Sequence, residues 1–199
     1  VGGPDDGLPG SDADVAVFEG SKGSYEFGVD ALSGSLTVTS KDTGSVDIVE
    51  GIETLSFGDG LLTVSRPSSD AAFTLTGADG ADDVIEVQSE IGFVLEGGSG
   101  ADTLIGGVGD DTLVGGGGDD VFVVDGGEDV IDGGAGRDAL DFSASASGVQ
   151  VDLSTGTLVD GEGFGDQFSS IEIVTGSNAT DTLVGSEDAD TLLGGGGDD

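Results

Sequence analysis

Residues 97–141 decide the fold and read GGSGADTLI, GGVGDDTLV, GGGGDDVFV, VDGGEDVID and GGAGRDALD, which are five consecutive nonapeptide blocks. The fourth place of every block is Gly, the sixth place is Asp, and the eighth place is a large apolar residue. Agreement at a fixed period indicates a repeat architecture, in which each unit packs mainly against its sequence neighbours.

Further copies of the block lie outside this stretch. Residues 77–85 read GADGADDVI, residues 176–184 read GSNATDTLV, residues 185–193 read GSEDADTLL, and residues 194–199 begin another copy with GGGGDD. Some blocks depart from the pattern, because Ala179 and Asp188 stand where Gly is expected and Val124-Asp125 replaces a glycine pair. If the turns of the repeat bind a ligand, we therefore expect weaker or absent ligand binding at these turns.

Each block predicts a tight turn followed by a short strand. The turn needs positive φ angles, which Gly adopts at little cost, and the apolar piece is β-prone. Alternation along the strand sends the eighth-place residue to one face. Two blocks then form one coil with two strands on opposite sides. The predicted fold is all-β, a right-handed parallel β-roll or β-solenoid with the eighth-place residues between its sheets.

This stacking brings acidic side chains together. Asp102, Asp120 and Asp138 fall on one edge of the coils, and Asp111 and Asp129 fall on the other. Neighbouring strands are about 4.8 Å apart, and two carboxylates roughly 5 Å apart repel by about 3 kcal/mol at an effective dielectric of 20. A divalent cation between each pair would reverse the sign of this interaction.

The available donors favour calcium. The sequence has no Cys and no His, so carboxylate and turn carbonyl oxygens are the ligands that the repeats can offer. Calcium accepts six to eight such oxygens in flexible geometry, whereas magnesium keeps its waters and zinc prefers His and Cys. The fold is therefore expected to be stapled by several calcium ions.

The charge balance excludes other classes of partner. The chain has 41 acidic residues, 4 basic residues and a formal net charge of −37. Nucleic acid and anionic membrane surfaces both require clustered Lys and Arg, and a membrane helix requires roughly 20 apolar residues. High charge and high Gly content are typical of disorder, but 35% hydrophobic residues and the periodic Gly argue against it. No nucleic-acid partner and no membrane insertion are expected.

The blocks resemble the nonapeptide repeats of the RTX (repeats-in-toxin) family of hemolysin-type calcium-binding proteins. The resemblance is specific over residues 97–123 and 133–141, and looser over 77–85 and 176–199. It implies that calcium lies between coils, held by sixth-place Asp side chains and turn Gly carbonyls. The implied ligands are Asp82, Asp102, Asp111, Asp120, Asp129, Asp138, Asp181, Asp190, Asp199, Gly98, Gly100, Gly107, Gly109, Gly116, Gly118, Gly134 and Gly136.

The chain is expected to divide into four segments. Residues 1–70 form a non-repeat β-rich segment, 71–141 an RTX-like calcium β-roll, 142–175 a second non-repeat β segment, and 176–199 a second RTX-like block. The short β-prone runs of the non-repeat segments favour wider coils of one continuous solenoid, with a separate small sandwich over residues 11–70 as the alternative. The stretch Arg66-Pro67-Ser68-Ser69 is the candidate linker.

RTX proteins leave Gram-negative bacteria unfolded by type I secretion and fold on meeting external calcium. The resemblance therefore implies a secreted protein, extracellular or on the cell surface of a Gram-negative bacterium. We expect a structural calcium-binding module of a filament, surface-layer or adhesin-like protein, and no enzyme. Self-association or other extracellular surface proteins are the expected partners. The alternative is the calcium-dependent folding and secretion module of a larger exoenzyme, such as a protease, lipase or epimerase.

Overall fold

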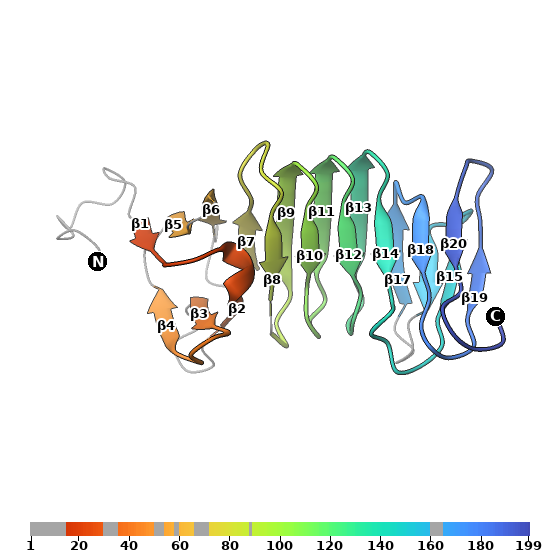
Figure 1. Ribbon diagram of the computed structural model, residues 1–199, viewed down its shortest axis with the longest axis horizontal. Helices are drawn as coiled ribbons and strands as arrows, with labels where there is room; N and C mark the ends of the chain where they lie inside the picture. Colours follow the sequence, from red (N-terminus) through yellow and green to blue (C-terminus); the bar gives the residue numbers. More distant parts are fainter. Residues whose placement is uncertain are drawn as a thin grey trace.

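The fold is all-β and is built around a parallel β-solenoid, as the repeats predict (Figure 1). The structure is a computed structural model and describes residues 15–29, 36–49, 54–57, 60–65, 72–87, 89–159 and 165–199. Two sheets stack face to face along the length of the molecule, and a small antiparallel sheet lies near one end (Figure 1).

Within the described residues, the larger sheet has eleven strands and the facing sheet has six. In spatial order the larger sheet contains β1 (Val15–Val17), β5 (Thr54–Phe57), β6 (Gly60–Ser65), β7 (Phe73–Thr76), β9 (Phe93–Ser99), β11 (Thr112–Gly117), β13 (Val130–Ala135), β17 (Gly165–Ser169), β16 (Thr157–Val159), β15 (Gln150–Asp152) and β19 (Thr182–Val184). The smaller sheet contains β20 (Thr191–Leu193), β18 (Ile173–Thr175), β14 (Ala139–Asp141), β12 (Val121–Val123), β10 (Thr103–Ile105) and β8 (Val84–Glu86).

The strand register confirms that two blocks make one coil. In the smaller sheet Thr103 pairs with Val121, and Val121 pairs with Ala139, in parallel. In the larger sheet Thr112 pairs with Val130 in the same way. Each offset equals the length of two blocks, so equivalent places of successive coils lie one strand spacing apart.

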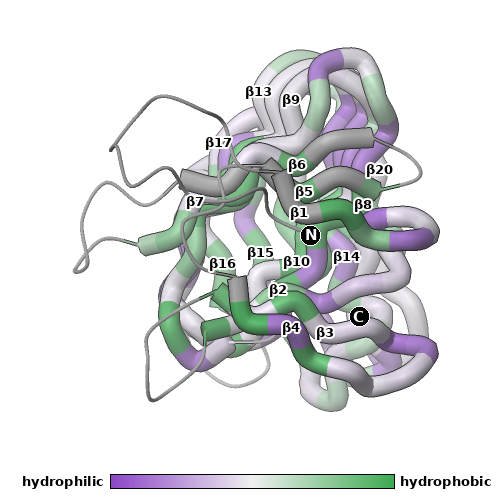
Figure 2. Tube along the Cα trace, turned by 90° about the vertical axis from the view of Figure 1, so that its left-hand side faces the viewer, coloured by the Kyte–Doolittle hydropathy of each residue, from purple (hydrophilic) through white to green (hydrophobic). Residues whose placement is uncertain are grey.

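The eighth-place residues form the core between the two sheets. Each of them is at most 1% exposed: Leu104, Leu113, Phe122, Ile131 and Leu140. Fully burying one such side chain contributes about 1.5–3 kcal/mol. Each of these strands contributes only one eighth-place side chain, so the core of the central repeats is thin. Hydrophilic residues gather in the turns at the edges of the coils in the view along the stack (Figure 2).

The non-repeat segment after residue 141 makes a wider coil. Ile173 pairs with Ala139, so the chain between these equivalent places is almost twice as long as in the central roll. The extra residues include β15, β16 and β17, which join the larger sheet as an antiparallel meander. Strands β15 and β18 overlap the β-prone runs of the sequence at residues 148–153 and 171–174, whereas no such run was predicted at β16 and β17.

The N-terminal segment combines two arrangements. Strands β1, β5 and β6 belong to the larger sheet. Strands β2 (Tyr25–Val29), β3 (Leu36–Ser40) and β4 (Val46–Val49) form an antiparallel sheet of their own, preceded by the short 3₁₀ helix η1 (Lys22–Ser24). A parallel bridge between Phe27 and Val87 joins this sheet to the end of the solenoid. The proposed linker at residues 66–69 lies outside the described residues.

Replacing Gly118 by Ala should strongly destabilise the roll. The backbone of Gly118 has φ +133°, and an added β-carbon would lie 1.6 Å from the carbonyl oxygen of Gly100 on the preceding coil. We expect a loss of about 3 kcal/mol or more in the free energy of unfolding, measured by urea denaturation in saturating calcium.

The matched control is Gly117→Ala. A β-carbon at Gly117 would meet nothing within 4 Å, so this change should leave stability within about 1 kcal/mol of the original. Equal effects of the two substitutions would contradict the close stacking of the turns.

Candidate metal centre

The sixth-place aspartates are buried, although each carries an ionisable carboxyl group. The side chains are 0–3% exposed at all five places of the central repeat: Asp102, Asp111, Asp120, Asp129 and Asp138. Asp is almost never fully buried unless it is paired. Each residue directly precedes a strand, so the repeat places one carboxyl group at the start of every strand from β10 to β14.

One oxygen of each carboxyl group is hydrogen-bonded to the preceding coil. The backbone N–H of Asp83 donates to Oδ1 of Asp102 at 2.7 Å, and that of Asp102 donates to Oδ1 of Asp120 at 2.8 Å. The N–H of Asp120 donates to Oδ1 of Asp138 at 2.9 Å. We call this column of carboxyl groups the first ladder.

The opposite edge carries a second ladder. The N–H of Phe93 donates to Oδ1 of Asp111 at 2.6 Å, and the N–H of Asp111 donates to Oδ1 of Asp129 at 2.9 Å. The N–H of Asp129 in turn donates to Oδ1 of Asp166 at 2.8 Å. Both predicted columns therefore form, and each fixes the orientation of its carboxyl groups through the backbone.

In four of the ladder carboxyl groups the other oxygen has no hydrogen-bond donor. Oδ2 is buried and without a hydrogen-bond partner in Asp102, Asp111, Asp120 and Asp138. A buried acceptor left unsatisfied costs about 1–3 kcal/mol, and more when it is charged. Four such atoms in equivalent places indicate a ligand of opposite charge.

A backbone carbonyl oxygen approaches each of these free oxygens on the first ladder. A β-carbon on Gly97 would lie 2.3 Å from Oδ2 of Asp102 and 2.8 Å from the carbonyl oxygen of Gly115 on the next coil. The same test at Gly115 gives 2.3 Å to Oδ2 of Asp120 and 2.7 Å to the carbonyl oxygen of Gly133. The first-place Gly therefore lets a carboxylate oxygen and a carbonyl oxygen pack close to its Cα, where any side chain would clash with both.

These first-place glycines were missed by the sequence analysis, which chose the second and fourth places. Positive φ angles occur at seven of the eight chosen glycines: Gly98, Gly100, Gly107, Gly116, Gly118, Gly134 and Gly136. Gly109 lacks a positive φ, but a β-carbon there would still lie 2.8 Å from the backbone of Ile91. The chosen glycines shape the turns, and the first-place glycines border the free carboxylate oxygens.

Burial shifts the protonation of the ladder carboxyl groups. It raises the pKa of Asp102 to about 6, that of Asp111 to about 7 and that of Asp129 to about 8, with neighbouring acidic groups adding to the rise. Burial also raises the pKa of Asp120 and Asp138. Without a cation, ionising these groups opposes folding.

The donor set fits calcium. Among the described residues, no three acidic side chains lie close enough to hold a metal ion by themselves. A site on a ladder must therefore combine carboxylate oxygens with backbone carbonyls and water, which is the coordination that calcium accepts. When bound there, calcium would supply positive charge to the free Oδ2 atoms.

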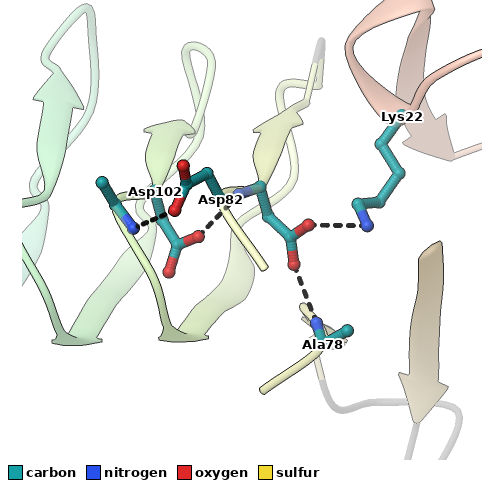
Figure 3. Close-up of polar contacts among 6 residues, drawn as sticks. Lys22, Ala78, Asp82 and Asp102 are labelled. Atoms are coloured by element: carbon teal, nitrogen blue, oxygen red, sulfur yellow. Dashed lines mark hydrogen bonds and ion pairs between the residues drawn. The ribbon is translucent and has the colours of Figure 1, made fainter. Parts of the chain in front are cut away.

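The block at residues 77–85 is shifted by one residue from the predicted frame. Asp82 is exposed, and its Oδ1 accepts the N–H of Ala101 at 2.8 Å (Figure 3). Asp83 is 1% exposed and takes the sixth-place position on the first ladder. Strands β8 and β10 accordingly pair Val84 with Thr103, an offset one residue longer than two blocks. The extra residue explains why the sequence pattern pointed to Asp82.

Asp83 is satisfied from within the protein. The ammonium of Lys22 lies 2.6 Å from its Oδ1 (Figure 3), and both side chains are fully buried. The backbone N–H of Ala78 donates to its Oδ2 at 2.8 Å. At this end of the first ladder, a lysine from η1 thus provides the positive charge that the other rungs lack.

In the last repeats, the second-place serine donates hydrogen bonds to the sixth-place carboxyl group of the same block. Ser177 donates its N–H to Oδ2 and its hydroxyl to Oδ1 of Asp181, each at 2.8 Å. Ser186 donates its N–H and its hydroxyl to Oδ2 of Asp190, at 2.6 and 2.9 Å. Asp199 is exposed, and its Oδ1 accepts the N–H of Asp181 at 3.0 Å. The second-place Ser177 therefore supplies a donor to both oxygens of Asp181, whereas Oδ1 of Asp190 stays buried without a hydrogen-bond partner.

Two acidic residues outside the repeats were missed by the sequence analysis. Asp166 in β17 continues the second ladder, and Glu172 continues the first by accepting the N–H of Asp138 at 3.0 Å. Glu172 lies two block lengths before Asp190, so counting back one coil would have found it. The separation of Asp166 from Asp129 is not a whole number of blocks, and the repeat period gives no signal for it.

At mildly acidic pH, where protonated carboxyl groups favour the cation-free fold, calcium binding should release protons. Carboxyl groups with pKa values of about 6 to 8 are partly protonated near pH 6.5 and must ionise to bind a cation. We expect affinity to fall as the pH drops from about 8 to 5, with little proton release above pH 9. Titration calorimetry in buffers of different ionisation enthalpy measures this release. A binding enthalpy that is independent of the buffer at pH 6.5 would contradict it.

Calcium affinity should rise with pH, whereas the stability of the cation-free fold should fall as the pH rises. A carboxyl group with a raised pKa in the fold favours folding when protonated. This contribution is fully present below the unfolded value near 3.8 and is lost as the pH rises through about 6 to 8.

Lys22→Met should destabilise the calcium-bound protein by about 3–5 kcal/mol, because it leaves Asp83 as an uncompensated buried charge. Chemical denaturation in saturating calcium measures the loss. Lys41→Met is the matched control, since Lys41 pairs with Glu86 at a partly exposed site and should contribute at most about 1 kcal/mol. Similar losses for both variants would show that the Lys22 pair has no special role.

Comparisons with known proteins agree with this geometry. The family model of the RTX calcium-binding nonapeptide repeat matches residues 94–122, 114–144 and 174–199. No curated protein is significantly similar to the chain. Among the described residues, no helix is long and apolar enough to span a membrane. The chain thus carries RTX calcium-binding nonapeptide repeats, folded as a parallel β-roll.

Proposed function

We propose that this chain is a calcium-stapled structural module of a secreted, extracellular protein of the filament, surface-layer or adhesin-like kind. It folds on binding several calcium ions after export. The observation that carries the proposal is the pair of buried carboxyl ladders. The backbone fixes one oxygen of each carboxyl group, and Oδ2 lacks a hydrogen-bond donor in Asp102, Asp111, Asp120 and Asp138. Repeats of this family suggest a secreted protein, which agrees with folding outside the cell.

The backbone orients the carboxyl groups of each proposed site independently of the ion. Backbone N–H groups hold Oδ1 of the ladder aspartates, so that Oδ2 turns toward the first-place Gly. The thin apolar core holds successive coils one strand spacing apart. Bound calcium neutralises the free oxygens, and the neighbouring coils then attract rather than repel one another.

The net negative charge of the chain makes folding depend on bound cations. Without cations, 37 net negative charges oppose collapse, and binding energy becomes folding energy. Extracellular calcium modules bind with dissociation constants of about 10⁻⁴–10⁻³ M. A module in this range stays unfolded where calcium is scarce and folds where it is abundant. The same step would serve the folding module of a larger exoenzyme.

We infer that the module itself does not catalyse a reaction. The support is that its buried carboxyl groups accept backbone N–H bonds within the ladders, which gives them a structural role. The partners proposed for such a module are other copies of the chain or other extracellular surface proteins.

Calcium should convert the chain from an expanded state to the β-roll, and Asp120→Asn should weaken this transition. Asp120 lies in the middle of the first ladder, between Asp102 and Asp138. We expect a rise of at least about tenfold in the calcium midpoint, equivalent to about 1.4 kcal/mol, in titrations followed by far-UV circular dichroism.

Asp119→Asn is the control. Asp119 is exposed, and an amide oxygen can still accept the N–H of Arg137 that its Oδ1 now accepts. Its midpoint should therefore change little. A β-roll spectrum that persists in excess chelator would refute the proposed calcium-dependent folding.

A further inference from the structure

Glu172 occupies a sixth-place position although it lies outside the matched repeats. It directly precedes Ile173, which pairs with Ala139 on one side and with Thr191 on the other. Its Oε2 accepts the N–H of Asp138 at 3.0 Å, as Oδ1 of Asp138 accepts the N–H of Asp120 at 2.9 Å. The glutamate therefore continues the first ladder across the wider coil.

An unsatisfied carboxylate oxygen lies at the same junction. Asp138 is 0% exposed, and its buried Oδ2 has no hydrogen-bond partner. A β-carbon on Gly133 would lie 2.6 Å from this Oδ2 and 1.9 Å from the carbonyl oxygen of Ser170. The Ser170 carbonyl thus stands where the carbonyls of Gly115 and Gly133 stand on the preceding coils.

The backbone of Ser170 has an unusual conformation at this junction. Its φ of 57° is the one positive φ at a non-glycine position among the described residues. Such a conformation is unfavourable for Ser and persists only where the surrounding structure imposes it. Here it accompanies a carbonyl oxygen that lies close to the buried Oδ2 of Asp138.

We propose that Asp138, the Ser170 carbonyl and Glu172 form a calcium site at the junction between the central roll and the wider coil. The donors are two carboxyl groups and one carbonyl, which a hard divalent cation prefers. Residues 145–173 fall between the family matches, so two of the three donors come from a segment that the repeat pattern does not cover.

Space for further ligands lies beside Glu172. A cavity of about 170 Å³ is bordered by Glu172, Ser170, Ser186 and Asp190. Calcium commonly completes its coordination with water, and a polar cavity of this size can hold several molecules. The site extends the first ladder toward the last repeats, so that calcium joins the two repeat blocks through the non-repeat coil.

The inference rests on the proposed calcium-binding function and is tested by Glu172→Gln. Glutamine keeps an oxygen that can accept the N–H of Asp138, but it removes the negative charge. A purely structural role would therefore survive this change. Native mass spectrometry and titration calorimetry with calcium should show one ion fewer, or one site weakened at least tenfold.

The control is Glu128→Gln, an exposed fifth-place residue whose replacement should leave the ion count and affinities unchanged. Ser170→Gly provides a second test, because it keeps the carbonyl donor and relieves the positive φ. It should retain every ion and raise the melting temperature in calcium.

Three results would overturn the inference. The first is an unchanged ion count and affinity in Glu172→Gln, and the second is the loss of an ion in Ser170→Gly. The third is the loss of all ions in Glu172→Gln, because the effect would then not be local. A wild-type chain that binds no calcium would overturn the proposed function as well, which separates the two failures.

Discussion

The structure depends on carboxyl groups that are buried in columns and are only half satisfied by the protein. Oδ1 of each ladder aspartate is fixed by the N–H of the preceding coil, and Oδ2 of Asp102, Asp111, Asp120 and Asp138 has no hydrogen-bond donor. In the central repeats each strand contributes one eighth-place side chain to the apolar core, which cannot readily offset several buried charges. A cation that bridges coils resolves this conflict, since it converts repulsion along the ladder into attraction.

The protein also uses positive charge of its own at one end of the first ladder. Lys22 reaches Asp83 from the small N-terminal helix, while Ala78 supplies an N–H to the other oxygen. In the last repeats, Ser177 and Ser186 replace second-place glycines and donate to Asp181 and Asp190. The chain therefore contains carboxyl groups that the protein satisfies itself, at Asp83 and Asp181, and carboxyl groups that keep a buried oxygen without a donor, including Oδ1 of Asp190.

The sequence was most informative where its period is strict. The two-block register, the buried eighth-place residues and both aspartate columns follow from local chemistry repeated at a fixed spacing, so they could be predicted. The shift from Asp82 to Asp83 could not, because one additional residue in a turn changes the frame without changing the composition. Nor could the ion pair of Lys22 with Asp83, since these two residues are distant in the chain and meet only through tertiary packing. Glu172 could have been predicted, because it lies two block lengths before Asp190. Asp166 could not, because its spacing from Asp129 does not follow the repeat period.

The most direct test is the anomalous scattering of crystals grown in calcium and collected at a long wavelength. The account predicts a peak within coordination distance of Oδ2 in each of Asp102, Asp111, Asp120 and Asp138, with a nearby carbonyl oxygen from the next coil on the first ladder. A well-ordered β-roll in saturating calcium with no peak beside these oxygens would contradict it.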